Sequence, residues 1–192
     1  MATMHYLFLG ILFIALCGFV GANSGILTSG YAVSPSIKVP GKRNDILQIA
    51  SGEIGVREAT GNNDGKRVEE YLGYIGLGKG YAWCAAFVSW CYGQAGLPEP
   101  RNPWSPALFP NARTYCKGDA CRRPITLTQI NPADVFGIYG QRVRRINHVG
   151  VVQAVQGKYL ITIEGNSNNR VESKRRHLST IYALADWIGG KP

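Results

Sequence analysis

Three residues of types used in covalent catalysis stand far apart in the sequence: Cys84, His148 and Glu164. A cysteine thiolate is a nucleophile, but it needs one group that holds and returns its proton and another that orients that partner. An imidazole and a carboxylate supply these two functions. We therefore treat Cys84 as the candidate nucleophile, His148 as its base and Glu164 as the orienting group, provided that the fold brings them together.

Cys84 begins an apolar segment in which Cys84, Val88, Cys91 and Ala95 recur at helical spacing. This pattern predicts one face of a buried helix. At the first turn of a helix, unpaired backbone amides and the positive end of the helix dipole favour a thiolate. Cys91 lies two turns further on, where we expect a buried and unreactive thiol. Without a base nearby, Cys84 would itself be interpreted as a core residue.

The second half of the chain predicts a β-sheet. Runs rich in β-branched residues, as in an antiparallel meander, cover residues 134–139, 148–155 and 159–164, and residues 181–188 could supply a last strand. His148 begins the second run and Glu164 ends the third. Strands joined by the short turn at residues 156–158 run antiparallel, so we expect His148 and Glu164 to lie opposite one another. Taken alone, His148 and Glu164 would each be interpreted as an ordinary residue at the end of a strand, whereas their pairing across two strands favours a functional site.

The residues before Cys84 predict two shorter helices. Asn44 and Asp45 form a polar cap ahead of an apolar stripe that stops near Gly55. Residues 66–72 predict a second short helix, reached through a loop of turn-forming residues and followed by a glycine-rich turn. After the helix of Cys84, the proline-rich segment 97–110 predicts an ordered loop.

The N-terminal segment differs in composition from the rest. Residues 1–37 contain no Lys, Arg, Asp or Glu, and residues 6–20 form an apolar run that is short for a membrane span but suits an export signal. We expect a signal peptide over residues 1–22, cleaved after Ala22, with an uncleaved anchor or an internal segment as alternatives. Residues 23–43 are expected to be a linker, and residues 44–190 the folded domain.

Export would permit disulfide bonds. Removal of the signal leaves Cys84, Cys91, Cys116 and Cys121. Cys116 and Cys121 bracket a short turn-like loop, which favours a disulfide between them. The alternatives are that both are free or that one of them pairs with Cys91. No pair of cysteines has the spacing of a zinc knuckle, so we expect no metal at these thiols.

The net charge of +9 is unevenly distributed. Residues 38–100 hold seven basic and seven acidic residues, whereas residues 101–192 hold fourteen basic and five acidic ones. A basic surface usually faces an anionic partner, which could be nucleic acid, a lipid surface or an acidic polymer, although it can also be a solvated face with no dedicated partner.

Three motifs together resemble the CHAP family of cysteine- and histidine-dependent amidohydrolases/peptidases of peptidoglycan. They are the segment at residues 81–91 around Cys84, the run at residues 147–152 that contains His148, and the Ile-Glu-Gly-Asn sequence at residues 163–166. The resemblance covers roughly residues 44–188 and implies a papain-like α+β fold, with N-terminal helices packed on a small antiparallel sheet.

The resemblance also implies site roles and a reaction. Cys84 would be the nucleophile, His148 the base and then the acid, Glu164 the orienting group, and Asn166 an auxiliary polar residue. The implied reaction is hydrolysis of a peptidoglycan amide bond without a cofactor, either as an N-acetylmuramoyl-L-alanine amidase or as a stem or crossbridge endopeptidase. Aromatic residues that could line the substrate groove, or equally belong to the core or rim, are Tyr81, Trp83 and Trp104. Some family members bind calcium before the cysteine, but here the carboxylates are too few.

Two other functions remain compatible with the same motifs. One is a non-catalytic module that binds or scaffolds the cell wall, and the other is a transamidase or other acyltransferase. For a secreted or envelope-localised enzyme, the basic half favours an anionic envelope polymer over nucleic acid, and we expect a monomer. The clusters expected to hold that polymer are Arg142, Arg144 and Arg145 before His148, and Lys174, Arg175 and Arg176 after Glu164.

Overall fold

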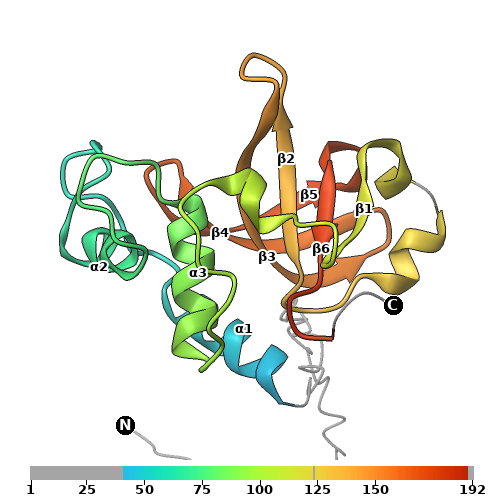
Figure 1. Ribbon diagram of the computed structural model, residues 1–192, viewed down its shortest axis with the longest axis horizontal. Coiled ribbons are helices and arrows are strands. Elements are labelled where there is room, and N and C mark those ends of the chain that lie inside the picture. The colour runs from blue at the N-terminus through green and yellow to red at the C-terminus, as the bar shows by residue number, and fades with distance from the viewer. Residues whose placement is uncertain (1–40, 123, 190–192) are drawn as a thin grey trace, which may run out of the picture. The chain divides into compact units, whose positions relative to one another are not determined.

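Three α-helices, four short 3-10 helices and one six-stranded sheet lie within residues 41–122 and 124–189, the part of the chain that the computed structural model describes (Figure 1). The helices are α1 (Lys42–Gly52), α2 (Lys66–Tyr74) and α3 (Cys84–Gln94). The strands are β1 (Thr114–Lys117), β2 (Val135–Gly140), β3 (Arg145–Gln156), β4 (Tyr159–Ser167), β5 (Arg170–His177) and β6 (Ala183–Ala185). This confirms the predicted α+β class with helices packed on an antiparallel sheet. The expected signal peptide and nearly all of the expected linker lie outside the described residues.

The sheet has the order β1-β6-β2-β3-β4-β5, and all of its strand pairs are antiparallel. The predicted meander corresponds to β2, β3 and β4. The predicted last strand is shorter than expected, because only Ala183–Ala185 pair in β6. The sequence analysis did not predict β1 or β5. The β5 segment RVESKRRH is too highly charged to resemble a strand of the core, yet it forms the sheet edge beside β4.

The helix α3 is buried on every side, because each residue from Cys84 to Tyr92 is buried. Its aromatic side chains Phe87 and Trp90, together with Trp83 just before the helix, pack against the ring of Tyr71 in α2. The first helix begins at Lys42, before the predicted cap. Gly41, with a φ of 73°, occupies the N-cap position, and Asn44 and Asp45 lie inside α1. The linker prediction therefore extended into the helix at Lys42.

The pairing of β3 with β4 differs from the predicted register. Val151 pairs with Ile163 and Val152 with Thr162, and an irregularity follows between Val152 and Ala154. Continuing this pairing by one residue places Glu164 opposite Gly150, two residues from His148. The two residues were therefore wrongly predicted to be direct partners. They lie diagonally across the strands, because the strands meet in a tighter turn and carry an irregularity that the sequence does not reveal.

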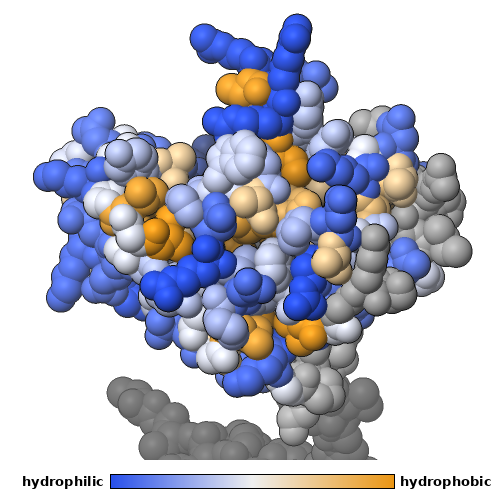
Figure 2. Space-filling view, in the orientation of Figure 1, coloured by the Kyte–Doolittle hydropathy of each residue, from blue (hydrophilic) through white to orange (hydrophobic). Residues whose placement is uncertain are grey.

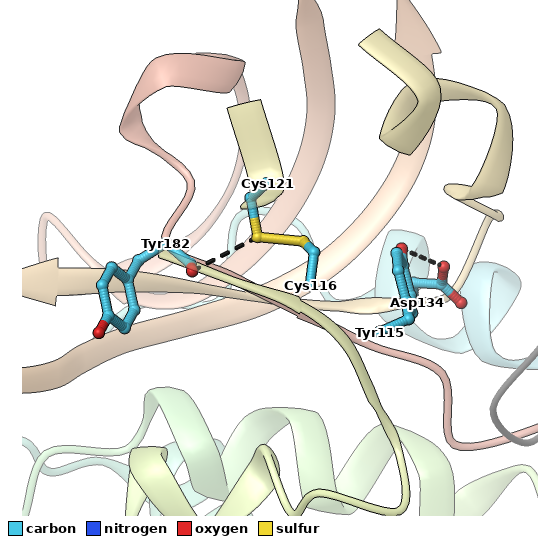
Figure 3. Close-up of a disulfide and its surroundings, with 5 residues drawn as sticks. All are labelled: Tyr115, Cys116, Cys121, Asp134 and Tyr182. Carbon is cyan, nitrogen blue, oxygen red and sulfur yellow. Dashed lines mark hydrogen bonds between the residues drawn. A yellow bond between two sulfur atoms is a disulfide. The ribbon is translucent and has the colours of Figure 1, made fainter. Parts of the chain in front are cut away.

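Cys116 and Cys121 form the predicted disulfide, near a second cluster of buried apolar residues (Figure 3). Cys121 Sγ lies 3.4 Å from the carbonyl oxygen of Tyr182, so the bridge lies against the chain that leads into β6. Cys84 and Cys91 are both free and buried.

The disulfide is expected to make only a modest contribution to stability, because the loop it closes is short. The cysteines are 5 positions apart in the sequence, for which loop-closure entropy corresponds to about 2 kcal/mol. Replacing both Cys116 and Cys121 by serine should lower the free energy of unfolding by about that amount. Urea unfolding followed by circular dichroism measures this change, and an unchanged midpoint would contradict it.

None of the helices in residues 41–122 and 124–189 is both long and apolar enough to cross a membrane.

Candidate active site

Cys84 is the first residue of α3, and its side chain meets groups from two other elements. The residue is 4% exposed. Its thiol hydrogen-bonds with the His148 side chain and lies within reach of the Val149 backbone amide. Its Sγ also lies 3.5 Å from Oγ of Ser105, in the short 3-10 helix η1 (Ser105–Leu108). The thiol that the sequence analysis singled out therefore has an imidazole as a direct partner.

His148 lies between Cys84 and Glu164. Its Nε2 is 2.8 Å from Oε2 of Glu164, whose side chain is fully buried. The His148 ring also packs edge-on against Phe136, with ring centroids 6.4 Å apart. Cys84, His148 and Glu164 thus form a continuous chain of hydrogen-bonding groups from the N-terminus of α3 to the sheet. This arrangement can hold an imidazole between a thiol and a carboxylate.

Gly150 has no side chain, and this leaves room for the side chains of His148 and Glu164, which lie diagonally across β3 and β4. A Cβ atom on Gly150 would lie 2.7 Å from Cε1 of Phe136, 2.8 Å from the Ile163 carbonyl oxygen and 3.0 Å from Cγ of Glu164. Any larger residue would displace the strand or the carboxylate, because contacts this short are strongly repulsive. Gly150 is therefore a requirement of the local packing beneath the site.

The electrostatic environment favours an ion pair between the thiolate and the imidazolium. Burial raises the pKa of the Cys84 thiol, but the hydrogen bond and positive charge of His148 outweigh burial and leave this pKa below its ordinary value. Burial lowers the pKa of His148, whereas its hydrogen bonds to Cys84 and Glu164 raise it to about 9. Between these two pKa values, the thiolate and the imidazolium coexist.

Glu164 is held in its ionised form by groups from β4 and β5. Burial would raise its pKa, but hydrogen bonds from Arg176, His148 and Thr162 lower it to about 2. Thr162 Oγ1 donates to Oε1 at 2.6 Å, and Arg176 donates to both carboxylate oxygens. Glu164 is therefore negatively charged at neutral pH.

A cavity of about 400 Å³ opens beside Cys84. Its lining residues are Leu77, Tyr81, Ala82, Cys84, Pro103, Trp104, Ser105, Arg145 and Asn147. Tyr81 and Trp104 are 58% and 55% exposed, so both rings can contact a bound molecule. Among these lining residues Arg145 is the only Arg, Lys, Asp or Glu, so a basic side chain lies at the cavity beside the Cys84 thiol.

Trp83 was wrongly grouped with the groove residues. It is fully buried, because it precedes α3 and packs on Tyr71 in the core. Its Nε1 donates to Oε1 of Glu58 at 2.8 Å. Asn166 donates to the same Glu58 oxygen at 3.0 Å and to Oδ1 of Asn63 at 2.8 Å. The recorded hydrogen bonds of Asn166 thus support Trp83, the neighbour of Cys84, and none of them reaches Cys84 or His148.

The two basic clusters differ in structure. Arg142, Arg144 and Arg145 are exposed on the hairpin that joins β2 to β3, which projects at the top of Figure 1 and is mostly hydrophilic in Figure 2. The cluster after Glu164 is not a free basic surface, which corrects the prediction. Lys174 Nζ lies 3.0 Å from Oε1 of Glu172, and Arg176 is bound to Glu164.

Sequence reasoning missed several residues that contact the site. Arg176 was interpreted as a surface charge, and no local pattern distinguishes it from Arg175, whose guanidinium carbon lies 3.3 Å from the centroid of the Tyr159 ring. Ser105 lies in the proline-rich segment, where nothing in the local sequence indicates a contact with Cys84. Thr162 could have been found, because it lies two residues before Glu164 on one strand and so points to the same face.

Residues 60–65, the turn-rich segment before α2, contain one carboxylate, and its hydrogen bonds to Thr60 stay within this segment. Asp64 Oδ1 accepts a hydrogen bond from the Thr60 amide at 2.9 Å, and Oδ2 accepts one from the Thr60 hydroxyl at 2.7 Å. Within residues 41–122 and 124–189, no group of three or more His, Cys, Asp or Glu side chains could hold a metal ion.

Solved structures with a similar chain course include RipD from Mycobacterium tuberculosis, described as a non-catalytic NlpC/p60 domain protein adapted to peptidoglycan binding. It has 12% sequence identity and a TM-score of 0.46 over 78% of this chain and 100% of its own. NlpC1 from Trichomonas vaginalis has 12% identity and a TM-score of 0.46, over 77% of this chain and 45% of its own. Ly7917 has 13% identity and a TM-score of 0.42, over 74% of this chain and 61% of its own.

A search of curated proteins found no match. The model of the CHAP domain family matches residues 76–166. The matched stretch contains Cys84, His148 and Glu164 in the order and spacing that the motifs indicated. Residues 76–166 of this chain are therefore similar to the CHAP domain family.

Proposed function

We propose that the chain is a cysteine hydrolase that cleaves an amide bond of peptidoglycan. The observation that carries this proposal is the hydrogen-bonded chain from Cys84 through His148 to Glu164, which ends at a cavity lined by exposed aromatic residues. The match to the CHAP family supports the substrate class. The bond cleaved is either the one that N-acetylmuramoyl-L-alanine amidases hydrolyse or a peptide bond of the stem or crossbridge, as in an endopeptidase.

The proposed reaction proceeds through a thioester. The Cys84 thiolate attacks the carbonyl carbon of the amide, and the backbone amide of Cys84 at the start of α3 helps to stabilise the oxyanion. The imidazolium of His148 then protonates the leaving amine, the C–N bond breaks, and the thioester remains. The neutral imidazole next takes a proton from water, which attacks the thioester and releases the carboxylic acid and the thiolate. Glu164 holds the imidazole in orientation throughout.

Mass spectrometry of muropeptides released by the purified protein tests this function. Hydrolysis adds one water across the cleaved amide, and the fragment masses identify the bond. If an added amine replaces the water, the chain is an acyltransferase on the same fold. If the protein binds cell-wall sacculi and releases no fragment, it is a non-catalytic wall-binding module, and the proposed reaction is wrong.

We propose that the enzyme acts outside the cytoplasm, as a secreted or envelope protein, and that the exposed β2–β3 hairpin binds anionic wall polymer. Replacing Arg142 and Arg144 by glutamate should weaken binding to purified sacculi about tenfold at low ionic strength, because four units of charge change on one projecting loop. The difference should disappear at about 1 M salt, where charges are screened within about 3 Å. Co-sedimentation measures the binding.

The matched control replaces Lys117 and Lys158 by glutamate, which changes the net charge equally at exposed positions away from the hairpin. This control should retain wild-type binding. Equal weakening by both double variants would show that only the net charge of the protein matters, and no weakening by the hairpin variant would leave the hairpin as a solvated surface.

A further inference from the structure

Arg176 extends from β5 to the buried carboxylate of Glu164 on the neighbouring strand β4. Its Nε donates to Oε1 at 2.8 Å, and its Nη2 donates to Oε2 at 2.6 Å. Oε2 is also the oxygen that contacts Nε2 of His148. A two-point contact of this kind fixes the plane of the carboxylate as well as its position. The orientation of the imidazole therefore depends on a residue one strand further from Cys84.

The protein itself satisfies the whole carboxylate. Two hydrogen bonds from Arg176, one from Thr162 and one from His148 account for about the four acceptor sites that a carboxylate offers. The side chain of Glu164 has no exposed surface, whereas that of Arg176 is 25% exposed. Water cannot readily replace Arg176 at Glu164 unless the strands rearrange. A buried carboxylate that loses a cation takes up a proton more easily.

The charged groups around Glu164 alternate in sign. Arg176 faces it from β5 and His148 from β3, and Cys84 of α3 lies beyond His148 next to the neutral Ser105. Glu172 of β5 pairs with Glu164 in the sheet register, but Arg170, Lys174 and Ser167 engage its carboxylate. The resulting order is thiolate, imidazolium, carboxylate and guanidinium.

We propose that Arg176 is a positioning residue of the active site, which keeps Glu164 ionised and oriented so that Glu164 can hold His148 toward Cys84. Arg176 acts through Glu164 and touches neither the thiol nor the cavity. When Arg176 is removed, Glu164 should bind a proton at a higher pH. Below that pH the imidazolium loses its partner, and the reactive ion pair with Cys84 is lost.

The rate of alkylation of Cys84 by iodoacetamide, followed from about pH 4 to pH 9, tests this role without any substrate. Mass spectrometry of the labelled peptide separates Cys84 from the other cysteines. Arg176→Ala should lower the rate about tenfold or more near pH 5, while the rate near pH 8 stays within about twofold of wild type, because only the acid limb moves. Arg176→Lys keeps the positive charge but loses the two-point contact with the carboxylate, so its alkylation rate near pH 5 should lie between those of wild type and Arg176→Ala. This variant also keeps the test usable if the alanine variant misfolds.

Arg170→Ala is the matched control, because it removes another arginine–glutamate pair on β5 that does not touch Glu164. It should keep the wild-type pH profile. In addition, Arg176→Ala should have no further effect once Glu164 is replaced by glutamine, because an effect transmitted through Glu164 requires its charge. The proposal would be overturned if both Arg176 variants kept the wild-type pH profile of Cys84 alkylation. It would also be overturned if Arg176→Ala lowered the alkylation rate equally whether residue 164 is glutamate or glutamine. This test is independent of the proposed function: a protein that cleaves no peptidoglycan can still show the shift in thiol reactivity.

Discussion

Replacing Cys84 by alanine is expected to abolish release of muropeptides while leaving the protein folded. The thiol is the proposed nucleophile, and it lies in the hydrogen-bonded chain with His148 and Glu164, where His148 lowers its pKa. Loss of a nucleophile from such a unit reduces turnover by about 10⁴- to 10⁶-fold. Release of soluble fragments from sacculi, compared with the wild-type rate, measures the loss. Thermal unfolding of the variant should remain cooperative, since alanine fits in place of a small buried side chain.

The matched control is Cys91→Ala. Cys91 lies on the same helix and is also free and buried, but burial raises its pKa well above the ordinary value and keeps the thiol protonated. The control should cleave peptidoglycan at nearly the wild-type rate. Undiminished activity in Cys84→Ala would rule out the thioester mechanism. Loss of activity in both variants, together with broadened unfolding, would indicate damage to α3 and not to the chemistry.

Replacing Arg43 by methionine is expected to cause a large loss of stability. Arg43 connects α1 to two adjacent strands at one end of the sheet: Nη1 donates to Oδ1 of Asp134, just before β2, at 2.8 Å, and Nη2 donates to Oδ2 of Asp186, just after β6, at 2.6 Å. The side chain of Asp134 is fully buried. Removing the cation leaves that charge without its ion pair, although Tyr115 still donates to it at 2.8 Å (Figure 3). Breaking a buried pair in this way typically costs about 3–5 kcal/mol.

The pH dependence of this loss provides a second measurement. Burial raises the pKa of Asp134 to about 6, even though hydrogen bonds from Asn131, Arg43 and Tyr115 oppose the shift. An acid whose pKa is higher in the folded state favours folding at low pH, and this contribution is lost as pH rises through about 6. Without Arg43 the pKa of Asp134 should rise further. The destabilisation measured by urea unfolding should therefore be largest above pH 7 and smaller near pH 5, where Asp134 is protonated.

Arg170→Met is the comparison for this experiment, because its partner Glu172 lies in a more exposed pair. Such a pair contributes at most about 1 kcal/mol. If Arg43→Met destabilised the protein no more than Arg170→Met, the cluster around Asp134 would have no special role in attaching α1 to the sheet.

The sequence by itself determined the elements that carry the candidate site. Helix α3 and strands β2, β3 and β4 could be predicted because their periodicity and their β-branched residues are local properties of the chain. The positions of Cys84, His148 and Glu164 on those elements were enough to predict that an antiparallel turn brings the imidazole near the carboxylate. The short loop between Cys116 and Cys121 likewise predicted the disulfide.

Only the tertiary structure decided which neighbours these residues have. Arg176 and Arg175 are adjacent and chemically identical, yet β5 pairing directs the first to the buried Glu164 and leaves the second against Tyr159. Trp83 and Trp104 look equally suited to a substrate groove, yet Trp83 is buried in the core at the start of α3 and Trp104 is exposed at the cavity. Register, burial and long-range ion pairs depend on how distant segments pack, and no local pattern of residues encodes that packing.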